Sequence, residues 1–302
     1  MTAALGPIVQ GLLLAALLLL PGSAVAGLLV ARHATSLDET GRGVVEGWLG
    51  RLPGLFAWFL LMLAVVRGAV QVLGFAFPGE PLPPELVRSV LLEGTWGAGW
   101  LTLVASSFLA LVFSWRLREH EGMQRTAVLL LAVAAIWGQT GMGHATDEVW
   151  ALPIGRLVHF GHLVGGSLWL GTLAVLAMAV FPTLAAPGRQ PALAGVVAGF
   201  SVPARIGAAL LVASGVVSTW TYTGGVPTAL WTTGWGRLLL VKLGLFASVA
   251  AFGWINWKRV TPQLLAGDAA APGALRRAVH RELLLGALLL AVTAVLVGTG
   301  FE

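Results

Sequence analysis

The sequence contains no cysteine and very little charge. The absence of cysteine excludes disulfide bonds, thiolate metal sites, thiol catalysis and cysteine-ligated iron–sulfur clusters. A soft metal ion must therefore be held by His and Met side chains. Only 10% of the 302 residues are charged, whereas a soluble domain carries roughly 25%. Most of the protein surface must accordingly face lipid.

Several sequence motifs are also missing. The chain has no Walker motif, no phosphorylation motif of a P-type pump and no Gly-rich dinucleotide loop, which argues against ATP-driven transport by this chain alone. No nucleophile–base–carboxylate set stands out, and no basic run is interleaved with aromatic residues. We therefore expect neither an enzyme nor a nucleic-acid-binding protein.

Hydrophobic residues make up 57% of the chain, and the mean hydropathy is +0.87. A helix needs about 20 apolar residues to cross a bilayer, and the sequence supplies such runs repeatedly. We predict an all-α polytopic membrane bundle of about eight transmembrane helices, forming a single domain over residues 1–302. The predicted helices are Pro7–Ala31, Gly54–Phe77, Gly94–Ser114, Arg125–Met142, Leu157–Phe181, Pro203–Thr221, Gly236–Asn256 and Glu282–Gly300.

Two segments need a separate interpretation. Ala24-Val25-Ala26 resembles a signal-peptidase site, but no Lys or Arg precedes it and the apolar run is long. We interpret this run as a retained first helix, since cleavage would leave seven helices. The longest loop follows Trp257, and its glycines and Pro272 predict a flexible hairpin.

Loop charge predicts the orientation of the bundle. The even-numbered loops contain only Arg88 and Arg156, with Arg237 at a helix mouth. The odd-numbered loops are basic, so we predict that they are cytoplasmic and that both termini lie outside, in the periplasm. Their basic residues are Arg32, Arg42, Arg51, Arg116, Arg118, Arg125, Arg189, Lys258, Arg259, Arg276, Arg277 and Arg281.

Three of the six histidines fall on the outer side of this topology. His159 and His162 open the fifth helix, three residues apart and so on one helical face. His144 lies in the preceding loop, and Met142 could add a thioether. Together these side chains can converge on one metal ion, although the pair can equally be interfacial polar groups. The other three, His33, His120 and His280, fall at the cytoplasmic surface, where solvated loop positions are expected.

Two cations lie within predicted helices. Arg67 is well inside the second helix, and Lys242 is nearly two turns into the seventh. A charge at such depth is costly without a partner or a water-filled cavity. Glu93, Asp147 and Glu148 at the outer side are candidate counter-ions. Arg67, Lys242 and Glu93 therefore form either a structural ion-pair network or part of a transport path.

Short motifs follow one another in a characteristic order over residues 143–300. They are Gly143-His144-Ala145, His159 with His162, Leu168-Trp169-Leu170-Gly171, Pro203 with Arg205, Gly236-Arg237-Leu238-Leu239 with Lys242, and Arg281-Glu282-Leu283. In the order of these motifs the second half of the chain resembles the CopD copper-resistance membrane proteins, whereas the first four helices match in architecture only.

The resemblance implies copper import, as Cu+ or Cu2+, across a bacterial inner (cytoplasmic) membrane. It also implies a periplasmic copper-binding partner of the CopC type. The main alternative is a b-type haem cytochrome, in which axial His residues would bind iron and Arg67 and Lys242 would neutralise propionates. A third hypothesis is a copper sensor or docking platform that binds metal without moving it.

Overall fold

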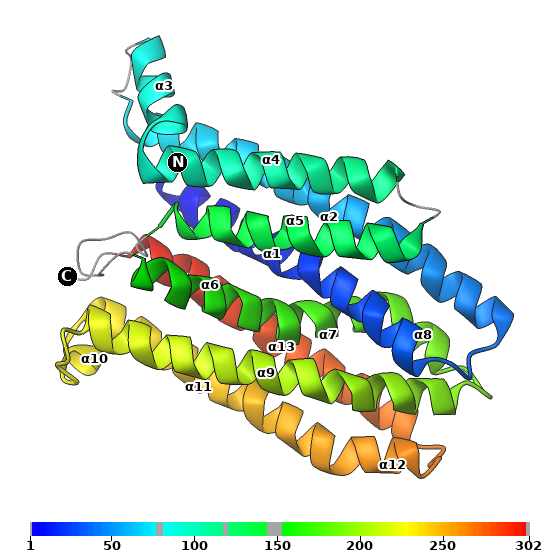
Figure 1. Ribbon diagram of the computed structural model, residues 1–302. Coiled ribbons are helices and arrows are strands. Elements are labelled where there is room, and N and C mark those ends of the chain that lie inside the picture. The colour runs from blue at the N-terminus through cyan, green and yellow to red at the C-terminus, as the bar shows by residue number, and fades with distance from the viewer. Residues whose placement is uncertain (1, 77–80, 117–119, 144–152, 300–302) are drawn as a thin grey trace.

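The described part of the chain is helical and contains no strand. The structure is a computed structural model, and it describes all residues except 1, 77–80, 117–119, 144–152 and 300–302. By length and composition, seven helical segments in this part of the chain are long and apolar enough to cross a membrane. The predicted all-α membrane bundle is confirmed at this level (Figure 1).

The N-terminal half consists of four long helices and one short helix. The long helices run side by side with alternating direction, and the short α3 lies at one end of the bundle (Figure 1). Helix α5 is not among the seven span candidates, because it has only 20 residues and polar residues occupy both of its ends. The elements are α1 (Thr2–His33), α2 (Glu39–Gly74), α3 (Pro84–Leu92), α4 (Gly94–Arg116) and α5 (Glu121–Thr140).

The C-terminal half contains four further passes, two of which are interrupted by π-helical turns. A π-helical turn inserts an extra residue into the helix and redirects the side chains that follow. The elements are α6 (Ile154–Gly166), η2 (Ser167–Gly171), α7 (Thr172–Val175), η3 (Leu176–Val180), α8 (Phe181–Leu184), α9 (Gln190–Tyr222), α10 (Ala229–Thr232), α11 (Gly234–Ile255), η4 (Asn256–Val260), α12 (Thr261–Leu265) and α13 (Ala271–Gly298).

The first residue of α1 and the last residue of α13 lie at the same end of the bundle, referred to below as the outer end (Figure 1). The connections α1–α2, α8–α9 and α12–α13 lie at the opposite end. This opposite end is referred to as the inner end, because its loops carry most of the basic residues.

Three helices begin more than ten residues before the predicted hydrophobic runs, each at the inner end. Helix α2 starts at Glu39 rather than near Gly54, because Asp38 caps it by accepting a hydrogen bond from Gly41 N (3.3 Å). Helices α9 and α13 start 13 and 11 residues before the predicted positions, and each has a proline in its first turn. A helical turn with charged residues outside the bilayer leaves no signal in a hydropathy pattern.

The predicted flexible hairpin after Trp257 is wrong. The chain there continues through η4 and α12 to Leu265, and only a short turn at Gly267 (φ 74°) precedes α13. Pro272 belongs to the first turn of α13 rather than to a loop, because its missing N–H costs nothing at that position.

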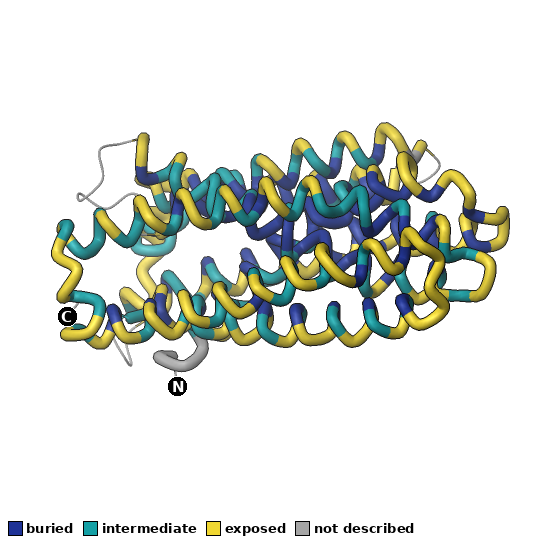
Figure 2. The backbone as a smooth tube through the Cα atoms, turned by 90° about the horizontal axis from the view of Figure 1, so that it is seen from below, coloured by how far each residue is buried: buried dark blue, intermediate teal, exposed yellow. Residues whose placement is uncertain are grey.

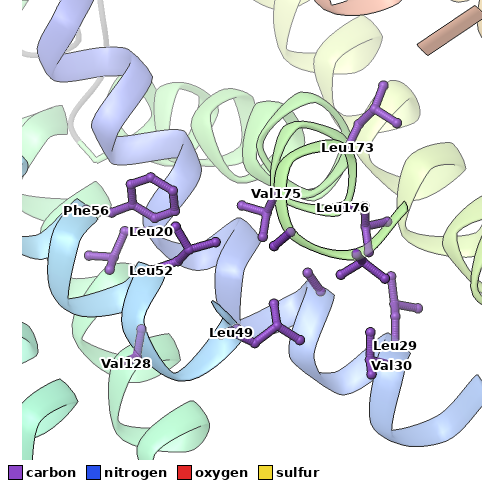
Figure 3. Close-up of a cluster of buried hydrophobic side chains, with 14 of the residues drawn as sticks. Leu20, Leu29, Val30, Leu49, Leu52, Phe56, Val128, Leu173, Val175 and Leu176 are labelled. Carbon is purple, nitrogen blue, oxygen red and sulfur yellow. The ribbon is translucent and has the colours of Figure 1, made fainter. Parts of the chain in front are cut away.

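Helix α1 is the centre of the bundle. In its most apolar stretch 78% of the residues are buried, compared with 11% in the corresponding stretches of α9 and of the helix from α11 to α12. Figure 3 shows Leu20, Leu29 and Val30 of α1 in one cluster with side chains of α2, α7 and η3. Exposed residues form the outside of the bundle (Figure 2), and many of them are large and apolar, as a lipid-facing surface requires.

The inner end is held together by one bidentate ion pair. Arg189, just before α9, donates from Nε and Nη2 to the two carboxylate oxygens of Asp38, just before α2 (2.6 and 2.8 Å). The hydrogen bonds from Arg189 hold the pKa of Asp38 below its usual value. The pair therefore joins the two halves of the chain, 151 residues apart in sequence.

Candidate metal site

The two outer histidines lie on α6, one turn apart. Given a rise of about 1.5 Å per residue, His159 and His162 lie roughly 8 and 12 Å along α6 from its first residue. Both side chains are partly buried. The Nδ1 atom of His162 lies 2.8 Å from Ser214 Oγ on α9. His162 therefore points toward a neighbouring helix rather than toward lipid.

The hydroxyl of Ser214 favours one tautomer of His162. Ser214 Oγ lies 2.6 Å from the carbonyl oxygen of Leu210, to which it can donate its only hydrogen. In that arrangement the Ser214 oxygen accepts a hydrogen bond from His162 Nδ1–H. The neutral imidazole consequently has its lone pair on Nε2, which is the form that binds a metal ion. Sequence reasoning did not identify Ser214.

Two glycines allow α6 and α9 to approach closely just beyond this pair. A Cβ atom at Gly165 would lie 2.8 Å from Gly207 O, and one at Gly207 would lie 2.6 Å from Gly165 O. The two backbones are thus in direct contact, as small residues permit in membrane helices. This contact fixes the distance between His162 and Ser214.

Lys242 of α11 lies close enough to His162 to interact with it electrostatically, as does His159. Lys242 is partly buried, and no Asp or Glu of the described residues lies within salt-bridge distance of it. A lysine cation beside an imidazole opposes the binding of a second cation. The predicted site and the predicted buried lysine are therefore neighbours.

Met142 and His162 lie toward different neighbours of α6. Met142 is buried in the main hydrophobic cluster after the end of α5. Phe160 and Arg156 mark the side of α6 that faces α5, since their side chains contact Trp137. His162, two residues beyond Phe160, is directed to α9 instead. His159 lies between the side of α6 that faces α5 and the side that faces α9. Of the two histidines it is therefore the nearer to α5, after which Met142 lies.

The third predicted ligand, His144, lies outside the described residues, as do Asp147 and Glu148. Within the described ranges, no three His, Asp or Glu side chains form a group that could hold a metal ion. The described part of the candidate site is therefore a pair of imidazoles on one helix.

Arg67 and Glu93 do not pair in the structure. Glu93 is exposed and lies 3.6 Å from Arg88 of α3. Arg67 is partly buried on α2 next to Gly68, against which the indole of Trp100 packs. No described carboxylate lies within salt-bridge distance of Arg67. The structure thus separates Glu93 from the two buried cations with which the sequence grouped it.

One further acidic residue lies inside the bundle. Glu282 on α13 is only 4% exposed and accepts a hydrogen bond from Asn256 of η4. The sequence placed Glu282 at a helix mouth, because the last hydrophobic run begins there. A carboxylate flanked by an apolar run is a signal that could have drawn attention to it.

The family model and the curated relative that match this chain are both described as copper proteins. The family model described as copper resistance protein D, CopD, matches residues 194–296. The copper transport protein CutJ of Bacillus subtilis is 27% identical over 184 residues, which cover 59% of this chain and 33% of CutJ. The chain thus spans about a third of the length of this curated relative. No solved structure matches. The matched residues 194–296 include Ser214, Lys242, Asn256 and Glu282, and they begin after α6, so they do not include His159 and His162.

Proposed function

We propose that this chain, which belongs to the CopD family, carries copper across the bacterial inner membrane in which its helices lie. The CopD match over residues 194–296 carries this proposal. A relative described as a copper transport protein and a bundle of long apolar helices support it. The chain is therefore a transport protein rather than an enzyme in this proposal.

The copper site of this proposal lies at the outer end. His159 and His162 are its core, with Met142 or His144 as the third ligand, and the unprotonated Nε2 of His162 is aimed at the ion. Imidazole binds both Cu+ and Cu2+, and a thioether favours Cu+. The orientation of Nδ1 by Ser214 supports this assignment, since a ligating histidine commonly donates its other N–H to a neighbour.

The topology of the proposal has eight passes with both termini in the periplasm. Helix α5 is the eighth pass, and it lies alongside α4 in the bundle (Figure 1). The basic inner end then faces the cytoplasm, as the distribution of positive charge favours. Copper is imported, and a periplasmic CopC-like protein delivers it to the outer end.

The test of this proposal is metal content measured together with the absorption spectrum of the purified protein. Wild type should bind copper, and His159→Ala and His162→Ala should lose it while the protein still inserts into membranes. His280→Ala, at an exposed position of the inner end, is the matched control and should retain copper. Unchanged copper in both outer variants would remove the site assignment.

The same spectrum separates the proposal from a haem protein. A b-type haem needs axial ligands on opposite faces of the ring. The two described histidines of the site are on one helix, a turn apart, so they cannot bind the iron of one haem from opposite faces of the ring. A Soret band without copper would nevertheless decide in favour of the cytochrome.

A further inference from the structure

The inner half of the C-terminal helices contains a carboxyl group that takes no part in the proposed outer copper site. Glu282 lies roughly 16 Å along α13 from the first residue of that helix and is 4% exposed. Its Oε1 atom accepts a hydrogen bond from Asn256 Nδ2. Asn256 begins the π-helical turn η4, and π-helical turns are frequent at functional sites.

An apolar aromatic side chain lies beside this carboxyl group. A Cβ atom at Gly253 of α11 would lie 3.5 Å from Glu282 Oε2 and 3.6 Å from Trp169 Cζ2. The carboxyl group and the edge of the Trp169 indole therefore share the space that Gly253 leaves open. Trp169 is 5% exposed and stacks edge-on against Phe246, with ring centroids 5.8 Å apart.

No cation of the described residues neutralises Glu282. Within the described ranges, no Lys, Arg or His lies within salt-bridge distance of it. Helices α7 and α12, which pack against α13, carry no titratable residue. The titratable residues on α13 itself and on the other elements packed against it are all exposed, except the partly buried Lys242. They are Arg32, His33, Arg237, Lys242, Lys258, Arg259, Arg276, Arg277, His280 and Arg281.

Lys242 lies at a different depth from Glu282. Glu282 lies at the level of Gly253 and Asn256, and Lys242 comes 11 residues before Gly253 on α11, which is roughly 16 Å along the helix. The lysine and the carboxyl group are therefore separated by about three turns along the bundle. The lysine lies nearer to the outer histidines, and among the described residues it does not serve as a cationic partner for the carboxyl group.

Keeping a carboxylate ionised inside the helix bundle costs free energy. One amide hydrogen bond does not offset the free energy of removing the charge from water. Ionisable groups inside membrane bundles typically serve proton or ion pathways. We propose that Glu282 is a proton-binding site, and that it releases its proton when copper enters the C-terminal helices. The second part of this proposal rests on the proposed copper transport.

The step balances without any electron transfer. The O–H bond of the Glu282 carboxyl group breaks, and the proton passes to water. The resulting carboxylate keeps its hydrogen bond from Asn256, and the positive charge of the arriving copper ion replaces that of the proton. When copper leaves, water returns a proton to the carboxylate.

Infrared spectroscopy of the purified full chain tests the first part without copper. At neutral pH, wild type should show an absorption band of a protonated carboxyl group that Glu282→Gln lacks. Glutamine keeps the acceptor for Asn256, so this variant should fold. Asn256→Ala should shift the same band, because it removes the hydrogen bond to the carboxyl oxygen. Glu39→Gln, at an exposed position of the inner end, is the control and should leave the band unchanged.

Proton release on copper addition tests the second part, with a pH dye in weakly buffered detergent solution. Wild type and Glu39→Gln should release protons as they bind copper, and Glu282→Gln should bind copper with that release lost. A band that survives in Glu282→Gln would overturn the proton site. Copper binding by wild type without proton release would overturn the coupling. Absence of copper binding by wild type would overturn the proposed function together with the coupling, and the infrared band would still decide the proton site.

Discussion

The two halves of the chain treat buried polar groups differently. In the N-terminal half, Gln124 donates to Ser114 O (2.6 Å) and Gly50 O (3.3 Å), and the Trp100 indole donates to Ala64 O (2.8 Å). These bonds link neighbouring helices through neutral groups. In the C-terminal half, by contrast, ionisable side chains such as His162, Lys242 and Glu282 lie inside the bundle with few partners.

This difference indicates that the two halves have different roles, one structural and one functional. Neutral hydrogen bonds between helices stabilise a fixed arrangement, whereas ionisable groups inside a membrane are costly and typically functional. The CopD match falls within the C-terminal half, and so do the π-helical turns. Arg67 of α2 is the exception in the N-terminal half. We expect α1–α5 to act as the scaffold for a working unit formed by α6–α13.

The largest effect is expected where the halves touch. A Cβ atom at Gly22 of α1 would lie 2.5 Å from the backbone carbonyl carbon of Gly171 in η2. Gly22→Leu should force the halves apart and lower the free energy of unfolding by about 1–3 kcal/mol or more. Thermal unfolding in detergent, followed by size-exclusion chromatography, measures this. Gly244→Ala, where nothing lies within 4 Å, is the control, and equal losses in both variants would refute the close contact.

A smaller loss is expected inside the scaffold. Gln124 is 2% exposed, and Gln124→Leu removes its hydrogen bonds to the buried carbonyl oxygen of Ser114 and to the partly buried carbonyl oxygen of Gly50. The free energy of unfolding should fall by about 1–2 kcal/mol, while copper binding per folded chain stays unchanged. Gln263→Leu, at an exposed position, should change neither quantity. Loss of copper affinity in Gln124→Leu would show that the N-terminal half is part of the working unit.

Lys242 provides a test of how the C-terminal helices control copper affinity. Lys242→Gln removes the cation beside His162 and should tighten copper binding by about tenfold, which corresponds to about 1.4 kcal/mol. A copper titration in competition with a chelator measures the affinity. The matched control is Lys258→Gln, because Lys258 lies at the inner end over the Trp257 ring. Weaker copper binding in Lys242→Gln would mean that the lysine positions the site rather than opposing it.

The smallest effect is expected at the ion pair that joins the halves at the inner end. Arg189 lowers the pKa of Asp38, so the pair stabilises the fold above the ordinary pKa of a carboxyl group. That stabilisation is lost as the pH falls through the lowered pKa. The melting temperatures of wild type and Arg189→Gln should therefore differ slightly at neutral pH and converge in acid. A difference that is constant with pH would exclude this linkage.

The sequence by itself determined the fold class and the chemistry available to the protein. Hydrophobic runs of about 20 residues leave only membrane helices as an outcome, and the absence of cysteine leaves His and Met as ligands for a soft metal. The spacing of His159 and His162 also placed both on one face of a helix. These features are local, so composition and helical periodicity are sufficient to read them.

The tertiary structure alone decided which of these groups meet. No pattern pairs His162 with Ser214, 52 residues away, or Glu282 with Asn256, because such contacts depend on how helices pack through glycine. Glu282 looked like a helix mouth in the sequence, since the inner turns of α13 are polar. Hydropathy registers the part of a helix that lies in lipid, whereas capping residues and packing decide where the helix begins and which side chains it buries.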